Sequence, residues 1–284
     1  MVQSWLQVSI RAAARDLDAL SDFVIERGSP GVVIKRGGLD AFFPSSRRDA
    51  ALRRDVRRFV ADRLRAAPRV DWKKVRPENW QHSWKRFIKP SRVGRSFWVT
   101  PPWLTPPRFR RRRVITIEPG MAFGTGTHGT TRACMELLEV VGARVDAGKF
   151  TVLDVGTGSG ILAIASALLG ATKICAIDND PVALEVAAEN LRANGVAEKV
   201  LLSAKPVHSI RQRFTVVVAN LTAETIDGLA AALQKRVTSN GYVILSGLLH
   251  GQGPAIARLF AGKFRVLERR RKREWTTLLL RRKN

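Results

Sequence analysis

Residues 152–160 read VLDVGTGSG, and the chain continues directly with the apolar run ILAIASALL at 161–169. The β-branched and apolar residues before the glycines predict a buried strand, and the longer apolar run after them predicts a helix. Glycines between the two let the backbone turn sharply and approach a ligand without a Cβ in the way. A strand, a glycine turn and a helix in this order are typical of the nucleotide-binding edge of an α/β sheet.

The spacing of the glycines indicates which nucleotide this edge would bind. Gly156, Gly158 and Gly160 form a GxGxG pattern, and Ile161 stands where a dinucleotide-binding fingerprint would have its third glycine. Asp154 precedes the first glycine by two residues. S-adenosyl-L-methionine carries an amino-acid tail and a sulfonium but no pyrophosphate, so this arrangement favours it as the cofactor.

A second acidic residue strengthens this interpretation. Asp178, in ICAIDND, ends the next expected strand 22 residues after Gly156. A carboxylate at that position can accept hydrogen bonds from the hydroxyls of a ribose. A glycine turn alone is weak evidence, because many α/β connections contain one. Together the turn and the two acids predict Asp154, Gly156, Gly158 and Asp178 as cofactor-binding residues.

From residue 114 onward the chain alternates short β-branched runs with Ala/Leu-rich helical stretches. Strands are expected at 152–155, 174–178, 200–203, 215–219 and 242–246. Two further strand-like runs, 264–270 and 275–280, are joined by a short charged stretch and predict an antiparallel hairpin. The predicted fold is α/β, a class I (Rossmann-like) methyltransferase domain with a doubly wound, mostly parallel, seven-stranded sheet.

The first 78 residues predict a separate, smaller domain. Its runs follow in the order strand, helix, strand, strand, helix, strand, which is the ferredoxin-like pattern of an α+β domain. These runs lie at 5–10, 12–27, 32–35, 41–43, 48–67 and 70–75. The predicted organisation is a small α+β domain at 1–78, a linker rich in Trp, Pro and Arg at 79–113, and the methyltransferase domain at 114–284.

Charge is distributed unevenly along the 284 residues, which carry a formal net charge of +25. Residues 1–113 contain 27 Lys/Arg against 10 Asp/Glu, residues 114–263 contain 13 against 12, and residues 264–284 contain 9 against 2. Two interpretations stay open. The basic residues form a solvated, arginine-rich surface, or they dock the protein onto a partner that contains nucleic acid.

The sequence gives no sign of a membrane segment, a disulfide framework or a metal site. Apolar runs such as 161–167 fall far short of the roughly 20 residues that span a bilayer, and we see no secretory signal. The two cysteines, Cys134 and Cys175, have no His or Cys at ligand spacing. We therefore expect a cytoplasmic protein without a metal.

A Gly/Thr-rich segment, EPGMAFGTGTHGTTRACMELLE at 118–139, precedes the first strand of the sheet. Such a loop could wrap a bound cofactor, and Thr131 could cap the following helix or donate to the carboxylate of the ligand. The alternative is a flexible connection. His128 is placed where a general base would be useful, but a structural histidine is the simpler interpretation.

Asn220 follows the fourth predicted strand, in VVVANLTAETI. Its amide oxygen could accept a hydrogen bond from an amine substrate and orient the nitrogen lone pair. We therefore consider Asn220 the candidate catalytic residue. The alternative is that Asn220 caps the helix expected at 222–236.

The motifs FGTGTH (123–128), DVGTGSG (154–160) and the Asn-Leu after the fourth strand resemble those of the PrmA family, the methyltransferases of large-subunit ribosomal protein eleven. The likeness extends to the linker at 79–103 and to REWTTLLL at 273–280, so it covers nearly the whole chain. It implies transfer of methyl groups from S-adenosyl-L-methionine to lysine side-chain or N-terminal amino groups of that ribosomal protein.

The resemblance also implies site residues and partners. The family's cofactor contacts fall on Thr131, Gly156, Asp178 and Asn220, and we also expect Phe123 and Thr127 of the FGTGTH loop to contact the cofactor. The resemblance further implies that the domain at 1–78 recognises the protein substrate. The basic charge of this domain leads us to expect contact with ribosomal RNA as well, and we expect a monomer.

Three positions depart from the family pattern, which usually has Asp at Glu118, Pro at Gly129 and a Leu-like residue at Thr222. The last lies near the substrate side and puts the substrate in doubt. The alternatives are therefore a lysine methyltransferase of another protein, an RNA methyltransferase, or a binding module without activity. Charge favours RNA as the substrate, but NLTA lacks the Pro-Pro-aromatic sequence typical of enzymes that methylate exocyclic base nitrogens.

Overall fold

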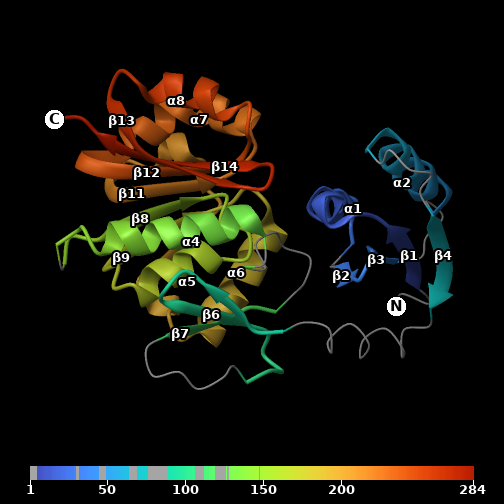
Figure 1. Cartoon of the computed structure of the whole chain (residues 1–284). Coiled ribbons are helices and arrows are strands. Elements are labelled where there is room, and N and C mark those ends of the chain that lie inside the picture. Colours follow the sequence, from blue (N-terminus) through green and yellow to red (C-terminus); the bar gives the residue numbers. More distant parts are fainter. Residues whose placement is uncertain are drawn as a thin grey trace. The chain divides into compact units, whose positions relative to one another are not determined.

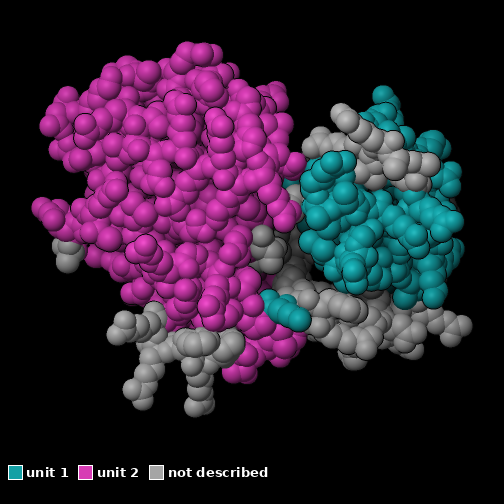
Figure 2. All heavy atoms as spheres, in the orientation of Figure 1, with its two compact units in different colours: residues 1–89, 119–121 teal, residues 90–118, 122–284 magenta. Residues whose placement is uncertain are grey.

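The computed structural model describes residues 5–29, 32–44, 49–63, 69–75, 89–105, 112–118, 126, 128–146 and 148–284. The chain divides into two compact units, which Figure 2 colours separately: residues 1–89 with 119–121, and residues 90–118 with 122–284. The region predicted as a linker therefore contributes its part from residue 90 onward to the second unit. None of the helices in the described ranges combines the length and the apolar character that a bilayer crossing requires.

The first unit contains the six elements that the sequence predicts, in the predicted order. They are β1 (Trp5–Arg11), α1 (Leu17–Glu26), β2 (Val32–Lys35), β3 (Gly38–Pro44), α2 (Asp49–Arg63) and β4 (Val70–Val75). The sheet has the order β2-β3-β1-β4, and every neighbouring pair is antiparallel. Its buried face packs against both helices through Val8, Leu20, Val24, Val56 and Val60.

The second unit is built on a seven-stranded sheet with the order β10-β9-β8-β11-β12-β14-β13. Its strands are β8 (Thr151–Val155), β9 (Lys173–Ile177), β10 (Val200–Ser203), β11 (Phe214–Asn220), β12 (Val237–Leu249), β13 (Phe264–Lys272) and β14 (Trp275–Arg282). The pairs from β10 to β12 are parallel, as predicted. Order and direction are those of the predicted doubly wound fold.

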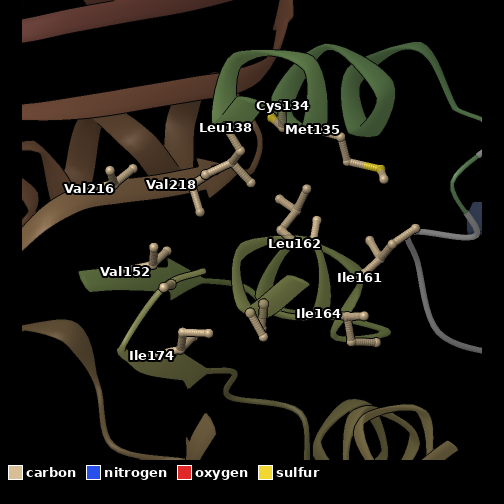
Figure 3. Close-up of a cluster of buried hydrophobic side chains, with 14 of the residues drawn as sticks. Cys134, Met135, Leu138, Val152, Ile161, Leu162, Ile164, Ile174, Val216 and Val218 are labelled. Atoms are coloured by element: carbon tan, nitrogen blue, oxygen red, sulfur yellow. The ribbon is translucent and has the colours of Figure 1, made fainter. Parts of the chain in front are cut away.

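Helices cover both faces of this sheet (Figure 1). They are α4 (Gly129–Gly142), α5 (Ile161–Leu168), α6 (Pro181–Ala193), α7 (Ala223–Lys235) and α8 (Gly253–Phe260). On one face, Cys134 and Leu138 of α4 and Leu162 of α5 point toward Val152 and Val218 of the sheet (Figure 3). On the other face, α7 and α8 bury Ile226, Leu233 and Phe260 against the sheet.

The last two strands of the chain form a hairpin at one edge of the sheet, and the second of them pairs with β12. β14 lies between β12 and β13 and is antiparallel to both. Leu278, Leu279 and Leu280 of β14 are fully buried, whereas β13, at the edge, alternates exposed and partly buried residues over most of its length. The predicted antiparallel hairpin is therefore present, with its second strand inside the sheet.

A three-stranded sheet, β5 (Ser91–Val93), β6 (Phe97–Thr100) and β7 (Arg113–Thr116), is fixed to the same unit. The Glu139 carboxylate on α4 accepts hydrogen bonds from the backbone N–H groups of Arg95 (2.9 Å) and Ser96 (2.8 Å). The Asn194 side chain accepts from the Thr116 N–H (2.8 Å) and donates to the Thr116 carbonyl (2.7 Å). Side chains of α4 and of the residue that follows α6 thus hold this small sheet on the second unit.

Candidate functional site

The glycine turn lies at the carboxyl end of β8, between that strand and α5. The N–H groups of Gly156 and Thr157 donate to the Ile177 carbonyl, at 2.9 and 3.0 Å, which ties the turn to β9. Gly156 has φ 74°, and a Cβ there would meet Leu221 Cδ2 at 2.4 Å. The backbone conformation therefore favours glycine at 156, and a larger residue would also have to displace the Leu221 side chain.

Asp178 lies directly after β9 and organises the turn. One carboxylate oxygen accepts from the Gly158 N–H (2.9 Å) and the other from the Asp180 N–H (3.1 Å). The side chain is only partly buried, so lone pairs of both oxygens remain open to a ligand. Sequence and structure thus agree in placing Asp178, Gly156 and Gly158 at one edge of the sheet.

Asp154 occupies the interior of β8 and is fully buried. Thr157, which the sequence analysis did not single out, donates from its hydroxyl to Asp154 Oδ2 (2.7 Å). Asp154 Oδ1 has no partner among the described residues. Burial raises the pKa of Asp154 to about 7; the Thr157 hydrogen bond opposes this shift, and the Asp178 charge adds to it. Through its hydrogen bond with Thr157, Asp154 therefore helps to fix the glycine turn.

The N-terminus of α4 approaches the end of β11. His128 caps this helix, because its Nδ1 accepts from the Thr130 N–H (3.3 Å) and lies 2.6 Å from the Thr130 hydroxyl. Thr131 is buried, and the Asn220 amide donates a long hydrogen bond of 3.5 Å to its hydroxyl. The structure thus brings the predicted residues Thr131 and Asn220 together, and it gives His128 a structural role.

Asn220 is the last residue of β11 and does not cap the next helix. Thr222 has that role, because its hydroxyl accepts from the Thr225 N–H (3.3 Å) at the start of α7. The alternative that Asn220 is the helix cap is therefore wrong. Asn220 Oδ1 is buried and has no partner among the described residues. This oxygen is available to accept a hydrogen bond from a ligand.

Two predicted contacts cannot be placed. Phe123 and Thr127, in the FGTGTH segment, lie outside the described residues. The described neighbour Gly126 has φ 77°, and a Cβ there would meet the Val99 side chain at 2.8 Å. The part of this segment that is described is therefore packed closely against β6.

The open oxygens of Asp178 and the glycine turn suit the ribose and the close approach of an adenosyl cofactor, and the unpartnered oxygen of Asn220 offers a further hydrogen-bond acceptor at the end of β11. Fold and site define an S-adenosyl-L-methionine-dependent methyltransferase. Residues 4–283 match the family described as ribosomal protein L11 methyltransferase (PrmA). The chain belongs to this family, as the resemblance implied.

Individual relatives agree with this assignment. The ribosomal protein L11 methyltransferase of Geobacter sp. (strain M21) is 36% identical in an alignment that covers 99% of each chain. That of Geobacter sulfurreducens is also 36% identical, and the alignment again covers 99% of each chain. The solved structure of ribosomal protein L11 methylase from Lactobacillus delbrueckii subsp. bulgaricus superposes with a TM-score of 0.62 at 32% identity, covering 69% of this chain and 100% of that one.

Gly129 offers a test of the local structure at α4. It is the first residue of the helix, where no intrahelical acceptor is available for its N–H. His128 before it is extended (φ −66°, ψ 141°), which proline at 129 tolerates. A Cβ would lie 3.8 Å from Lys272 Cβ, an ordinary contact. We expect Gly129→Pro to raise the free energy of unfolding by about 0.4–1 kcal/mol in urea titrations. A decrease would contradict this geometry.

Proposed function

We propose that this enzyme transfers methyl groups from S-adenosyl-L-methionine to lysine side-chain or N-terminal amino groups of ribosomal protein L11. The supporting observation is the buried, unpartnered Oδ1 of Asn220 at the carboxyl end of β11. An amide oxygen accepts an N–H from an amine, and this directs the nitrogen lone pair. The names of the relatives supply the acceptor protein.

The chemistry requires a neutral amine in line with a methyl group that the bound cofactor carries on its sulfonium. Because the sulfonium is already activated, the chain mainly has to align the two partners. A lysine of pKa about 10.4 needs about 4–5 kcal/mol to lose its proton at pH 7, whereas an N-terminal amine near 8 needs only about 1 kcal/mol. Asn220 would position either acceptor once it is neutral.

A groove on the same unit also suits a cationic acceptor. It has a volume of about 750 Å³, lies between α7 and α8, and is lined by Glu224, Asp227 and Arg258 among others, so acids outnumber bases there. These acids stand out in a chain of net charge +25. They would favour the approach of a lysine-rich segment through charge complementarity.

The test is transfer of labelled methyl groups to purified, unmethylated ribosomal protein L11. We expect label on that protein, and Asn220→Ala should remove most of the label while calorimetry still detects cofactor binding. Asn284→Ala, which removes the amide of an exposed residue without a structural role described above, should retain activity. Cofactor binding without label on the protein would refute the proposed substrate. Label on other proteins, or label lost on RNase treatment of a lysate, would favour the alternative substrates.

We further propose that the N-terminal unit contacts ribosomal RNA near the acceptor protein, and that the enzyme acts in the cytoplasm as a monomer. Arg54, Arg57 and Arg58 are exposed and lie at i, i+3 and i+4 of α2, so they share one side of the helix. A cationic helix face of this kind suits a phosphate backbone. Size-exclusion chromatography with light scattering tests the monomeric state.

The charge reversal Arg54→Glu, Arg57→Glu and Arg58→Glu should lower methylation of the ribosome-associated acceptor about tenfold. Loss of three exposed charge contacts of about 0.5 kcal/mol each accounts for this size. Cofactor affinity in calorimetry should not change. The matched reversal of Lys205, Arg211 and Arg213, exposed residues of the catalytic unit, should have little effect. Unchanged turnover of the α2 variant would rule out this role.

A further inference from the structure

The outer edge of the seven-stranded sheet carries an unusual density of positive charge. Residues 263–274 read KFRVLERRRKRE, and β13 within this segment is the edge strand. Lys263, Arg265, Arg269 and Arg271 are all exposed. These four residues are called the cationic edge below.

Neighbouring charges are neutralised inside the unit, but the cationic edge is not. Glu136 on α4 forms ion pairs with Arg270 (3.0 Å) and Lys272 (2.5 Å), and Glu268 pairs with Arg270 (2.6 Å). Among the described residues, none of the four side chains of the cationic edge forms a salt bridge with an acid. Placing like charges together costs free energy, which a bound polyanion would recover.

A β-bulge directs these charges to both sides of the strand. The register of β13 against β14 shifts between Val266 and Glu268, so that Arg265 lies opposite Arg281 and Arg269 lies opposite Leu278. Residues 278 and 281 are an odd number of positions apart and face opposite sides of the sheet. Arg265 therefore lies on one face, and Arg269 and Arg271 lie on the other.

We propose that the cationic edge binds the phosphodiester backbone of RNA. Guanidinium groups match phosphate oxygens with paired hydrogen bonds. Nine residues of extended strand span about 30 Å, and cations on both faces of this strand can contact a polyanion that follows the sheet edge. Charged side chains on an edge strand also discourage pairing with another chain, and here four unpaired cations flank the strand. The choice of RNA as the polyanion rests on the proposed ribosomal substrate.

The experiment compares two full-length variants that lose the same charge. One changes Lys263, Arg265, Arg269 and Arg271 to Gln; the control makes the same change at Lys199, Lys205, Arg211 and Arg213, which are exposed residues of the stretch 199–213 and lie outside the cationic edge. Fluorescence anisotropy with a labelled single-stranded RNA of mixed sequence gives the dissociation constant over a salt series. The slope of log K against log salt should fall by about 3 in the first variant.

We expect the affinity of the first variant at low salt to fall at least tenfold, and that of the control to change less than threefold. Equal losses in both variants would overturn the proposal, because net charge alone would then explain binding. Unimpaired binding by the first variant would also overturn it, as would a wild type that prefers anionic phospholipid vesicles to RNA. Circular dichroism and cofactor binding confirm folding of both variants. Methyl transfer to free ribosomal protein L11 is measured separately, so failure of the proposed function is distinguishable from failure of RNA binding.

Discussion

Asp178→Ala is expected to weaken S-adenosyl-L-methionine binding about a hundredfold or more. The carboxylate anchors the glycine turn through Gly158, and its open lone pairs are the proposed acceptors for the ribose hydroxyls. Two hydrogen bonds to a charged acceptor contribute about 3 kcal/mol or more together, which corresponds to this factor. Isothermal titration calorimetry measures the loss directly.

The matched control is Asp180→Asn, which removes the same charge two residues away. Asp180 caps α6 by accepting from the Val182 N–H (2.9 Å), and Asn is an equally good cap. This variant should bind the cofactor nearly as well as the wild type. The cofactor affinity of Asp178→Asn should lie between those of Asp178→Ala and the wild type. Its NH₂ group would face one of the two N–H groups that now donate to the carboxylate. Equal affinities for all three variants would contradict the assignment of Asp178.

Asp154→Asn is expected to stabilise the protein without cofactor at pH 8 and to leave its stability nearly unchanged near pH 4. Burial raises the pKa of Asp154 from 3.8 to about 7. The contribution of Asp154 to stability is therefore greatest below pH 4, falls as the pH rises toward 7, and is constant above that. The loss amounts to up to about 4 kcal/mol. Asn has nearly the shape of the protonated side chain and does not titrate.

Urea denaturation at several pH values measures this difference. Asp146→Asn, the same change at an exposed acid, is the control and should show no comparable pH dependence. A stability difference between Asp154→Asn and the wild type that stays constant from pH 4 to 8 would show that Asp154 is not forced to take up a proton on folding.

The sequence predicts most of the fold because its patterns are local. Alternating β-branched runs and helices identify the parallel strands, and the six elements of the first unit follow in the predicted order. The position of β14 inside the sheet depends instead on which hairpin strand docks on β12. Residues 275–280, WTTLLL, carry no charge and place leucines on both faces, whereas residues 267–272, LERRRK, are mostly charged. Burial of both faces therefore selects the second strand for the inner position.

The sequence predicts a site residue where a functional side chain or a glycine stands at the end of a predicted strand. Asp178 and the glycines are recognisable because they end or follow strands. Thr157 has no such signal, since its contact with Asp154 depends on how the turn closes. Similarly, Asn220 and Thr222 are both good helix caps, and only the end of β11 at Asn220 decides between them. The structure therefore adds the polar contacts that hold the predicted residues in place.

The insertion of β14 also determines when the catalytic unit can fold. β14 is the last strand of the sheet to be synthesised, and it separates β12 from β13. Until β14 has been synthesised, β13 has no partner in the sheet, and the hydrogen-bonding edge of β12 that pairs with β14 stays open. Pairing of β12 with β14 must therefore wait until synthesis has passed residue 282. Messages that end early would yield an aggregation-prone chain with an exposed strand edge rather than a weakened enzyme.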